Sequence, residues 1–249
     1  MTKAGNDKCI PSPPALRPRA TRFARSASSR DDRRVSGTIV RFGVIGDIHC
    51  EDALLAAALD HLSRQRLDHI LAVGDLADGR GDLDRCCELL ERHGVTVVAG
   101  NHDRWLLADQ MRDLSDASAP AEVSERSRSY LAKLPPTVRF ETVAGALLLC
   151  HGLDENDMAK VGPDDDGYAI ESNFALQRLM QSEYSFVLCG HTHRRMVRRF
   201  GALTVINAGT LHFAHTPGFG VVDLDARFVQ FHELAPDGSI TEAKRLLLP

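Results

Sequence analysis

Three apolar stretches of the chain each end in a glycine followed by polar residues, and this pattern restricts the possible folds more than any other feature. The motifs are Gly46-Asp47-Ile48-His49, Gly74-Asp75-Leu76-Ala77-Asp78 and Gly100-Asn101-His102-Asp103. Between them, residues 51–65 and 82–94 carry apolar side chains at helical spacing. Two parallel strands need a long crossover, usually a helix, and such connections are right-handed. The sequence therefore predicts successive βαβ units whose three strand ends lie at one edge of a parallel sheet.

The rest of the chain predicts further strands and outer helices. Residues 38–46 are predicted to form the first strand in one piece, residues 104–134 to be helical with a break near Pro120, and residues 171–181 to form a later helix. Short β-like stretches follow from about residue 194 to the end of the chain. Buried parallel strands followed by antiparallel ones predict an α/β fold, a layered β-sandwich of two mixed sheets flanked by helices.

Residues 1–36 differ from the rest of the chain in composition. They are rich in Pro and Ser and contain nine Lys or Arg residues against three Asp residues. Because such a segment cannot bury enough apolar surface to offset its ordering entropy, we predict a disordered basic tail at 1–36 and a folded domain at 37–249. An organellar transit peptide, a regulatory tail or an upstream start site would each explain the tail.

The folded domain excludes some classes of protein. In residues 37–249 acidic residues outnumber basic ones by ten, which makes binding to long nucleic acid unfavourable. The longest uninterrupted apolar stretch, residues 53–59, is too short to cross a membrane. The six cysteines show no CxxC spacing, and we predict reduced thiols in a cytoplasmic protein.

Seven potential metal ligands follow the predicted strands. They are Asp47, His49, Asp75, Asn101, His151, His191 and His193. In open α/β sheets, ligands bind beyond the carboxyl ends of the strands. This set of carboxylate, amide and imidazole donors suits Mn, Fe or Zn. Seven donors are too many for one ion but suit two ions about 3.5–4 Å apart, which can hold a bridging hydroxide and clamp a phosphoryl group.

Each motif alone has an ordinary structural explanation. Gly-Asp and Gly-Asn turns are common, and a lone His151 is more typical of a core or capping histidine. Loop capping explains Asp78 and Asp103 about as well as a functional role does. The five clusters together, all after apolar stretches and in one order, are not explained by turns.

The ordered set GD-x-H, GD-x-x-D, GNHD, H and GH-x-H resembles the calcineurin-like metallophosphoesterase superfamily, in particular its small prokaryotic phosphodiesterases. The resemblance extends from residue 39 to about residue 210. It implies the metallophosphoesterase fold and a metal-dependent phosphoric ester hydrolase with two divalent ions, Mn being favoured over Fe, Zn and Ni. The roles that it implies are a first metal on Asp47, His49 and His193, a bridging Asp75, and a second metal on Asn101, His151 and His191. His102 would stabilise the transition state or protonate the leaving oxygen, and Asp78 would orient it.

One arginine of the family pattern is displaced in this chain, and its position bears on the substrate. Protein phosphatases and diadenosine tetraphosphatases of the family carry Arg directly after GD-x-x-D, whereas this chain has Gly79 there and Arg80 next. We therefore consider Arg80 and Arg104 as phosphate-binding residues. The loop at 153–168 contains six acidic residues and one lysine. It would repel a polyanion if it lined the cleft, or would be an ordinary solvated loop.

These observations predict an enzyme that hydrolyses a small phosphodiester or phosphomonoester. The alternatives are a dinucleoside polyphosphate hydrolase, an enzyme resembling serine/threonine protein phosphatases, and a non-catalytic scaffold on the same fold. The sequence does not indicate an oligomeric state.

Overall fold

Two six-stranded mixed sheets form the centre of the computed structural model, which describes residue 1 and residues 34–248. In spatial order, the first sheet contains β1 (Arg34–Ile39), β5 (Thr137–Thr142), β6 (Gly145–Cys150), β7 (Tyr184–Cys189), β9 (Leu203–Asn207) and β8 (Met196–Phe200). The second contains β12 (Ile240–Leu247), β11 (Phe228–Leu234), β10 (Gly218–Asp223), β2 (Arg41–Ile45), β3 (His69–Ala72) and β4 (Thr96–Val97). The predicted basic tail lies almost entirely outside the described residues.

The predicted βαβ units are confirmed. Strands β2, β3 and β4 pair in parallel, with Ile45 opposite Ala72 and Ala72 opposite Val97. Their carboxyl ends therefore lie together at one edge of the second sheet. The crossovers contain α1 (Asp52–Ser63) and α2 (Leu83–Arg92). The Asp82 side chain caps α2 by accepting a hydrogen bond from the backbone N–H of Arg85.

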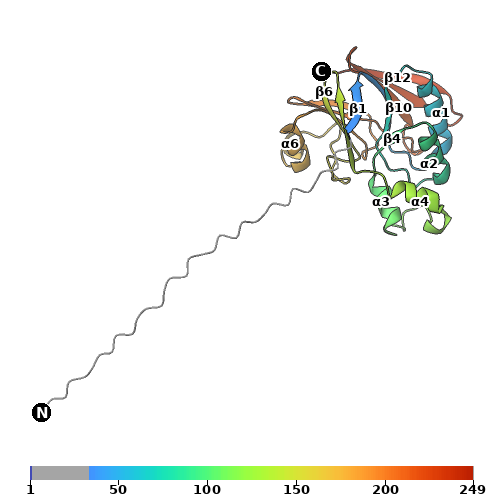
Figure 1. Cartoon of the computed structure of the whole chain (residues 1–249), viewed down its shortest axis with the longest axis horizontal. Coiled ribbons are helices and arrows are strands. Elements are labelled where there is room, and N and C mark those ends of the chain that lie inside the picture. Colours follow the sequence, from blue (N-terminus) through green and yellow to red (C-terminus); the bar gives the residue numbers. More distant parts are fainter. Residues whose placement is uncertain (2–33, 249) are drawn as a thin grey trace. The chain divides into compact units, whose positions relative to one another are not determined.

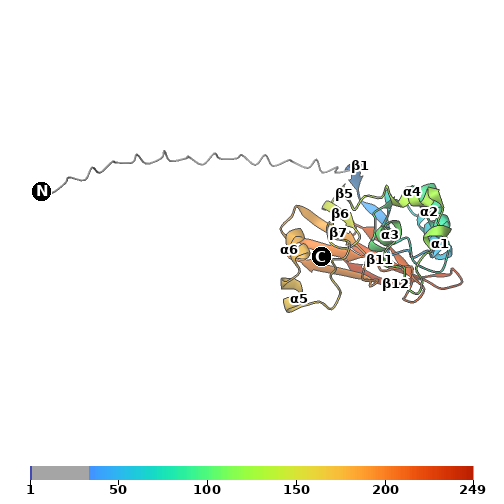
Figure 2. The same ribbon diagram turned by 90° about the horizontal axis from the view of Figure 1, so that it is seen from below.

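Helices cover the outer faces of both sheets. They are α1, α2, α3 (Asn101–Leu107), a 3₁₀ turn (Pro120–Glu122), α4 (Glu125–Leu131), α5 (Gly167–Glu171) and α6 (Phe174–Met180). Figures 1 and 2 show α1 and α2 on one side of the sheets and α6 on the other. One apolar cluster packs α1 and α2 on the second sheet, another lies between the sheets, and a third packs α6 on the first sheet. The layered architecture predicted from the sequence is confirmed.

The first predicted strand is wrong in one respect, because the chain passes from one sheet to the other within it. It breaks at Val40, so that β1 joins the first sheet and β2 the second. The Asp68 carboxylate fixes this break by accepting hydrogen bonds from the backbone N–H groups of Val40 and Arg41, at 2.8 and 2.9 Å. Strand β1 begins at Arg34, so the predicted boundary at residue 37 falls within this strand.

Two predicted helices also begin or end at residues other than those predicted. The helix predicted over 104–134 begins earlier, at Asn101, and ends at Leu107; the chain then forms turns, with left-handed backbone at Asp109 and Met111, before α4. The helix predicted over 171–181 begins later, as α6 at Phe174, and only its first predicted residue, Glu171, belongs to α5. The side chain of Asn173 begins α6 by accepting a hydrogen bond from the N–H of Leu176.

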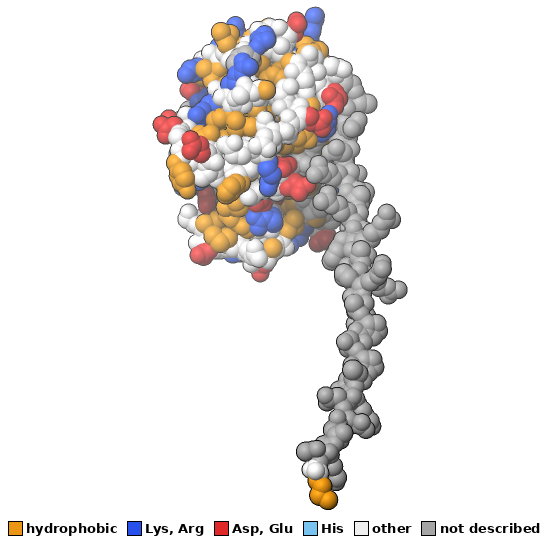
Figure 3. All heavy atoms as spheres, turned by 90° about the vertical axis from the view of Figure 1, so that its left-hand side faces the viewer, with side chains coloured by type: hydrophobic (Ala, Val, Ile, Leu, Met, Phe, Trp, Pro, Cys, Tyr) orange, Lys and Arg blue, Asp and Glu red, His pale blue; other side chains and the backbone are white. Residues whose placement is uncertain are grey.

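The surface and the cysteines of the described residues are those of an ordinary folded domain. No helix within residues 34–248 is long and apolar enough to cross a membrane. On the face drawn in Figure 3, basic, acidic and hydrophobic side chains are interspersed. The described cysteines are free and buried, and Cys150 and Cys189 pack in the cluster beneath α6, as small apolar residues would.

Candidate metal centre

All seven predicted ligands follow the carboxyl ends of strands, six of them in loops and Asn101 as the first residue of α3. Four of them adopt left-handed backbone conformations, with φ between 48° and 64°: His49, Asp75, His191 and His193. Such conformations are costly for residues other than glycine and concentrate at functional sites. Two glycines lie against the carboxylates of Asp75 and Asp47, where a larger residue would collide with them. A Cβ at Gly100 would lie 2.1 Å from Asp75 Oδ1, and a Cβ at Gly190 would lie 2.3 Å from Asp47 Oδ1.

The first group of donors combines the loop after β2 with the loop after β7. His49 Nε2 lies 3.0 Å from His193 Nε2, and His193 Nε2 lies 3.4 Å from Asp47 Oδ2. The His49 Nδ1 atom is 2.7 Å from the backbone carbonyl of Asp78. Its Nδ1–H therefore donates to that carbonyl, so that Nε2 presents its lone pair to the site. A backbone partner of this kind is characteristic of metal-binding histidines.

The second group surrounds His151. Its Nε2 atom lies 3.0 Å from Asn101 Oδ1 and 3.2 Å from Asp75 Oδ2, and its Nδ1–H donates to the carbonyl of Val73 at 2.8 Å. His191 meets the same group, with its ring 5.3 Å from that of His151. One ligand atom from each of Asp75, His151 and His191 lies within 4.8 Å of the others. These residues could hold a second cation.

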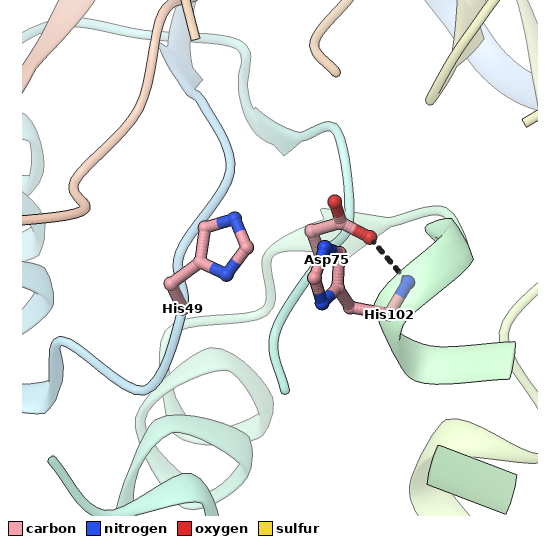
Figure 4. A group of neighbouring side chains, drawn as sticks. All are labelled: His49, Asp75 and His102. Atoms are coloured by element: carbon pink, nitrogen blue, oxygen red, sulfur yellow. Dashed lines mark hydrogen bonds between the residues drawn. The ribbon is translucent and has the colours of Figure 1, made fainter. Parts of the chain in front are cut away.

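Asp75 lies between the two groups. It belongs to the cluster with His151 and His191, and also to a cluster with His49 and His102. Figure 4 shows the rings of His49 and His102 beside this carboxylate, and the backbone N–H of His102 donates to Asp75 Oδ1 at 2.8 Å. The other oxygen is left for the His151 side. A carboxylate in this position is able to bridge two cations.

The carboxylates of Asp47 and Asp75 are both buried in the centre. Asp47 Oδ2 is buried and accepts no hydrogen bond from the residues that the structure describes. Burial, together with the charge of Asp75, raises the pKa of Asp47 to about 7 although His151 opposes the shift. Despite its burial, His151 has a pKa raised to about 10 by the carboxylates of Asp75 and Asp47. A positive charge between these carboxylates is therefore favourable, and a divalent cation bound there would supply one.

The other imidazoles are held in the form that binds metal. Burial lowers the pKa of His49 to about 4, that of His191 to about 4 and that of His193 to about 3. Neutral imidazole is the ligand form, so these three side chains need not lose a proton before metal binds at neutral pH. The donor set fits divalent cations with borderline preferences, such as Mn, Fe, Zn and Ni.

His102 and Asp78 lie at the rim of the centre. His102 Nδ1 is 2.8 Å from Asp78 Oδ2. Partial burial opposes protonation, but the hydrogen bond to Asp78 and the charges of Asp75 and Asp78 raise the pKa of His102 above its ordinary value. Nε2 remains available to a substrate. Asp78 is thus placed to orient the His102 ring, and the catalytic role of the pair stays a prediction.

Asp103, the last residue of the third motif, has a different task. Its carboxylate accepts hydrogen bonds from the backbone N–H groups of Leu76, Ala77 and Gly100, at 2.8, 3.1 and 2.9 Å. It thereby ties the loop after β3 to the start of α3. Of the two roles considered for Asp103, capping of the loop is the one that these contacts support.

The two arginines considered for phosphate binding are both engaged with other side chains. The Arg80 guanidinium lies 3.6 Å above the ring of Phe213. Arg104 forms two hydrogen bonds with Asp157, from Nε at 2.6 Å and from Nη2 at 3.0 Å. Arg104, Asp157 and His151 line the same cavity of about 250 Å³. Part of the acidic loop thus lies beside the second group of donors.

Several residues near the centre were not predicted. Arg112 and Ser118 bind Asp78, and Asp116 lies 3.1 Å from His212, whose ring packs against that of His49. The histidine content of residues 212–215 was a usable signal, because these histidines lie outside every motif. Arg112, Asp116 and Ser118 carry no such signal, since their segment has neither a motif nor a regular period.

Comparisons with known proteins agree on the fold. The family model of the calcineurin-like phosphoesterase superfamily domain matches residues 40–227. No curated protein matches the chain. A metallophosphoesterase from Sphaerobacter thermophilus is similar, with 18% sequence identity, a TM-score of 0.60 and coverage of 80% of this chain and 89% of that one. Vps29 from Entamoeba histolytica has 20% identity and a TM-score of 0.53, over 84% of this chain and 99% of that one. The phosphoesterase YfcE from E. coli has 17% identity and a TM-score of 0.51, over 84% of this chain and 100% of that one. At these low identities, the structural similarity supports the fold only and not a shared function.

Proposed function

This chain belongs to the calcineurin-like phosphoesterase superfamily, and from that premise we propose that it hydrolyses a small phosphodiester or phosphomonoester with two divalent cations. The observation that carries the proposal is the position of Asp75 between two groups of donors. We propose that Asp47, His49 and His193 hold one cation, that Asn101, His151 and His191 hold the other, and that Asp75 bridges them.

The cations would activate a water molecule near neutral pH and neutralise charge on the phosphoryl oxygens. The chain's own residues would do the rest. His102 holds a proton on Nε2 and gives it to the leaving oxygen as the P–O bond breaks, and Asp78 orients the ring through Nδ1. Removal of such an acid typically lowers the rate by about 10²–10⁴-fold.

The surroundings of the centre favour a small substrate. The side chain of Asp157 lies close enough to His191 to act on its charge, and Asp154 and Glu155 line the same cavity as Asp157. A long polyanion would pass close to these carboxylates and be repelled at low salt. This supports a short ester over a nucleic acid.

The complete donor set supports an enzyme over a scaffold, and a substrate screen tests the choice. Purified protein is assayed with Mn, Fe, Zn or Ni against phosphomonoesters, cyclic and linear phosphodiesters, and dinucleoside polyphosphates, with Asp75→Asn as the blank. We expect metal-dependent hydrolysis of a small ester, highest with Mn, and close to two metal ions per chain. Hydrolysis that persists in Asp75→Asn, or a protein that binds no metal, would refute the proposal.

A further inference from the structure

The segment that follows α3 carries an arginine into the centre from outside every sequence motif. Arg112 forms a two-pronged pair with Asp78, from Nη1 to Oδ1 at 2.7 Å and from Nη2 to Oδ2 at 2.8 Å. The same guanidinium donates to the backbone carbonyls of Gln110 and Ser118, at 2.6 and 3.0 Å. The side chain is 16% exposed, and that of Asp78 is fully buried. Arg112 is therefore fixed in one orientation.

The Asp78 carboxylate is also fixed in one orientation, because each of its oxygens accepts two hydrogen bonds. Oδ1 accepts from Arg112 and from the backbone N–H of Ser118, at 2.9 Å, and Oδ2 accepts from Arg112 and from His102. Ser118 Oγ also accepts from the backbone N–H of Asp78, at 3.0 Å. Rotation of the carboxylate would break all the bonds to its oxygens at once. Oδ2 is thereby held opposite His102 Nδ1.

The segment is also tied down beyond Arg112. Asp116 Oδ2 lies 3.1 Å from His212 Nε2, and His212 Nδ1 accepts from the backbone N–H of Ala214. The His212 ring meets that of His49 at 5.0 Å in an edge-to-face contact. The segment from Arg112 to Ser118 is thus attached both to Asp78 and to His212.

We propose that Arg112 is a positioning residue, which holds Asp78 so that His102 carries its mobile proton on Nε2, toward the leaving group. The proposal rests on the proposed function. In the step concerned, the oxygen of water forms the new P–O bond and releases a proton to solvent, from which His102 is later reprotonated, and the old P–O bond breaks with its electron pair on the leaving oxygen. That oxygen takes the proton from His102 Nε2. Arg112 touches neither substrate nor metal and acts only through Asp78.

The test compares two esters that share the same phosphoryl part but differ in the leaving group, one a nitrophenol and the other an alkyl alcohol. A nitrophenolate leaves without a proton, whereas an alkoxide needs one. In Arg112→Gln we expect kcat for the alkyl ester to fall by about 10- to 100-fold, with KM unchanged and a much smaller loss for the nitrophenyl ester. Arg112→Lys, which keeps the charge but cannot form the two-pronged pair, should lie in between. Arg126→Gln, which removes an exposed arginine paired with Glu91, is the matched control.

A second measurement does not depend on activity. The measurement is ¹⁵N-histidine NMR of the zinc-loaded protein. Once His102 has lost its Nε2 proton, the neutral ring should keep its remaining proton on Nδ1, facing Asp78, in the wild type. In Arg112→Gln the neutral ring should populate both tautomers. A rise in KM with both esters would show that Arg112 binds substrate instead, and an equal loss of kcat with both esters, or unchanged tautomers, would overturn the proposal. Failure of the proposed function looks different, because the wild type and Arg126→Gln would then hydrolyse neither ester.

Discussion

The Nε2 atoms of His49 and His193 lie 3.0 Å apart, although 144 positions separate the two residues in the chain. His49 donates its Nδ1–H to the carbonyl of Asp78, so that in the neutral ring Nε2 has only a lone pair to offer. A proton or a cation must lie between two such nitrogens. Burial lowers the pKa values of both rings, which makes a shared cation the better partner.

A first prediction concerns the stability that this cation provides. A ligand that binds only the folded state stabilises it by about 2.7 kcal/mol at 100 times its Kd. For a domain of this size, that corresponds to a rise in Tm of about 5–10 °C per ion. We expect Mn or Zn to raise the Tm of the wild type in differential scanning fluorimetry, and to raise it less in His193→Ala.

His215→Ala is the control for this measurement. The exposed His215 ring meets the His193 ring edge-to-face at 4.6 Å but belongs to neither donor group. Its replacement should leave the rise in Tm intact. An equal loss of the metal effect in the two variants would remove His193 from the ligand set.

The metal-free protein should lose stability as pH rises from 6.5 to 8. A carboxyl or imidazole whose folded pKa lies above its unfolded value binds extra protons in the folded state, so its contribution is lost as pH rises through that pKa. Asp47, with its pKa raised from 3.8 to about 7, His151, with its pKa raised from 6.5 to about 10, and His102, whose pKa the hydrogen bond to Asp78 raises, all act in this direction. The imidazoles with lowered pKa values act in the opposite direction, mainly below pH 7, because an unfolded imidazole titrates around pH 6.5.

Urea unfolding in EDTA at pH 6.5 and pH 8 measures this loss. Asp47→Asn should flatten the dependence, because it removes one of these groups and one of the carboxylates that raise the pKa of His151. Saturation with metal should also remove it, since the cation replaces the proton. The same decline in wild type and Asp47→Asn would show that Asp47 is not the group responsible.

The parts of the site that could be predicted from the sequence are those in which position along the chain determines position in space. Asp47, Asp75 and Asn101 each follow an apolar strand directly, so the parallel sheet alone brings them to one edge. Arg112 has no such relation to the sheet. Its place depends on turns after α3 and on a carboxylate 34 positions earlier. Neither a period nor a motif records contacts of this kind.

The same distinction explains the errors in the fold. Ile39 and Phe42, one on each side of the break, are both apolar and buried, so hydrophobicity could not show that the chain changes sheets there. The cause is the side chain of Asp68, 28 positions later, which binds the backbone at the break. The helix predicted over 171–181 begins only after Asn173, a cap residue within an otherwise helical pattern. That signal was present in the sequence, and it was outweighed by the apolar spacing.

The pH dependence of activity tests the His102–Asp78 pair. If His102 gives a proton to the leaving group, kcat falls as pH rises above the pKa of His102. The hydrogen bond and charge of Asp78 raise that pKa, so in Asp78→Asn the alkaline limb of the pH profile should move to lower pH. Asp84→Asn is the control, because Asp84 binds Ser124 away from the centre. An unchanged alkaline limb in Asp78→Asn would assign it to another group.

The last prediction concerns the pairing of Arg104 with Asp157. The two hydrogen bonds that Asp157 accepts are of the kind that a phosphate would accept from the same guanidinium. The arginine is therefore available to a substrate only after Asp157 is displaced. Because the pair is partly exposed, the cost of displacement is small. Asp157→Asn should lower KM for a small phosphate ester by about 1.5- to 5-fold, and less at high salt.

Glu155→Gln separates release of the arginine from the general effect of loop charge. Glu155 lines the same cavity and carries the same charge, but the two hydrogen bonds of Arg104 go to Asp157. Equal decreases of KM in the two variants would mean that only the charge of the loop matters. A rise of KM in Asp157→Asn would mean that Asp157 holds Arg104 ready for the substrate. A decrease confined to Asp157→Asn would identify Arg104 as a phosphate-binding residue that this carboxylate keeps occupied until a substrate arrives.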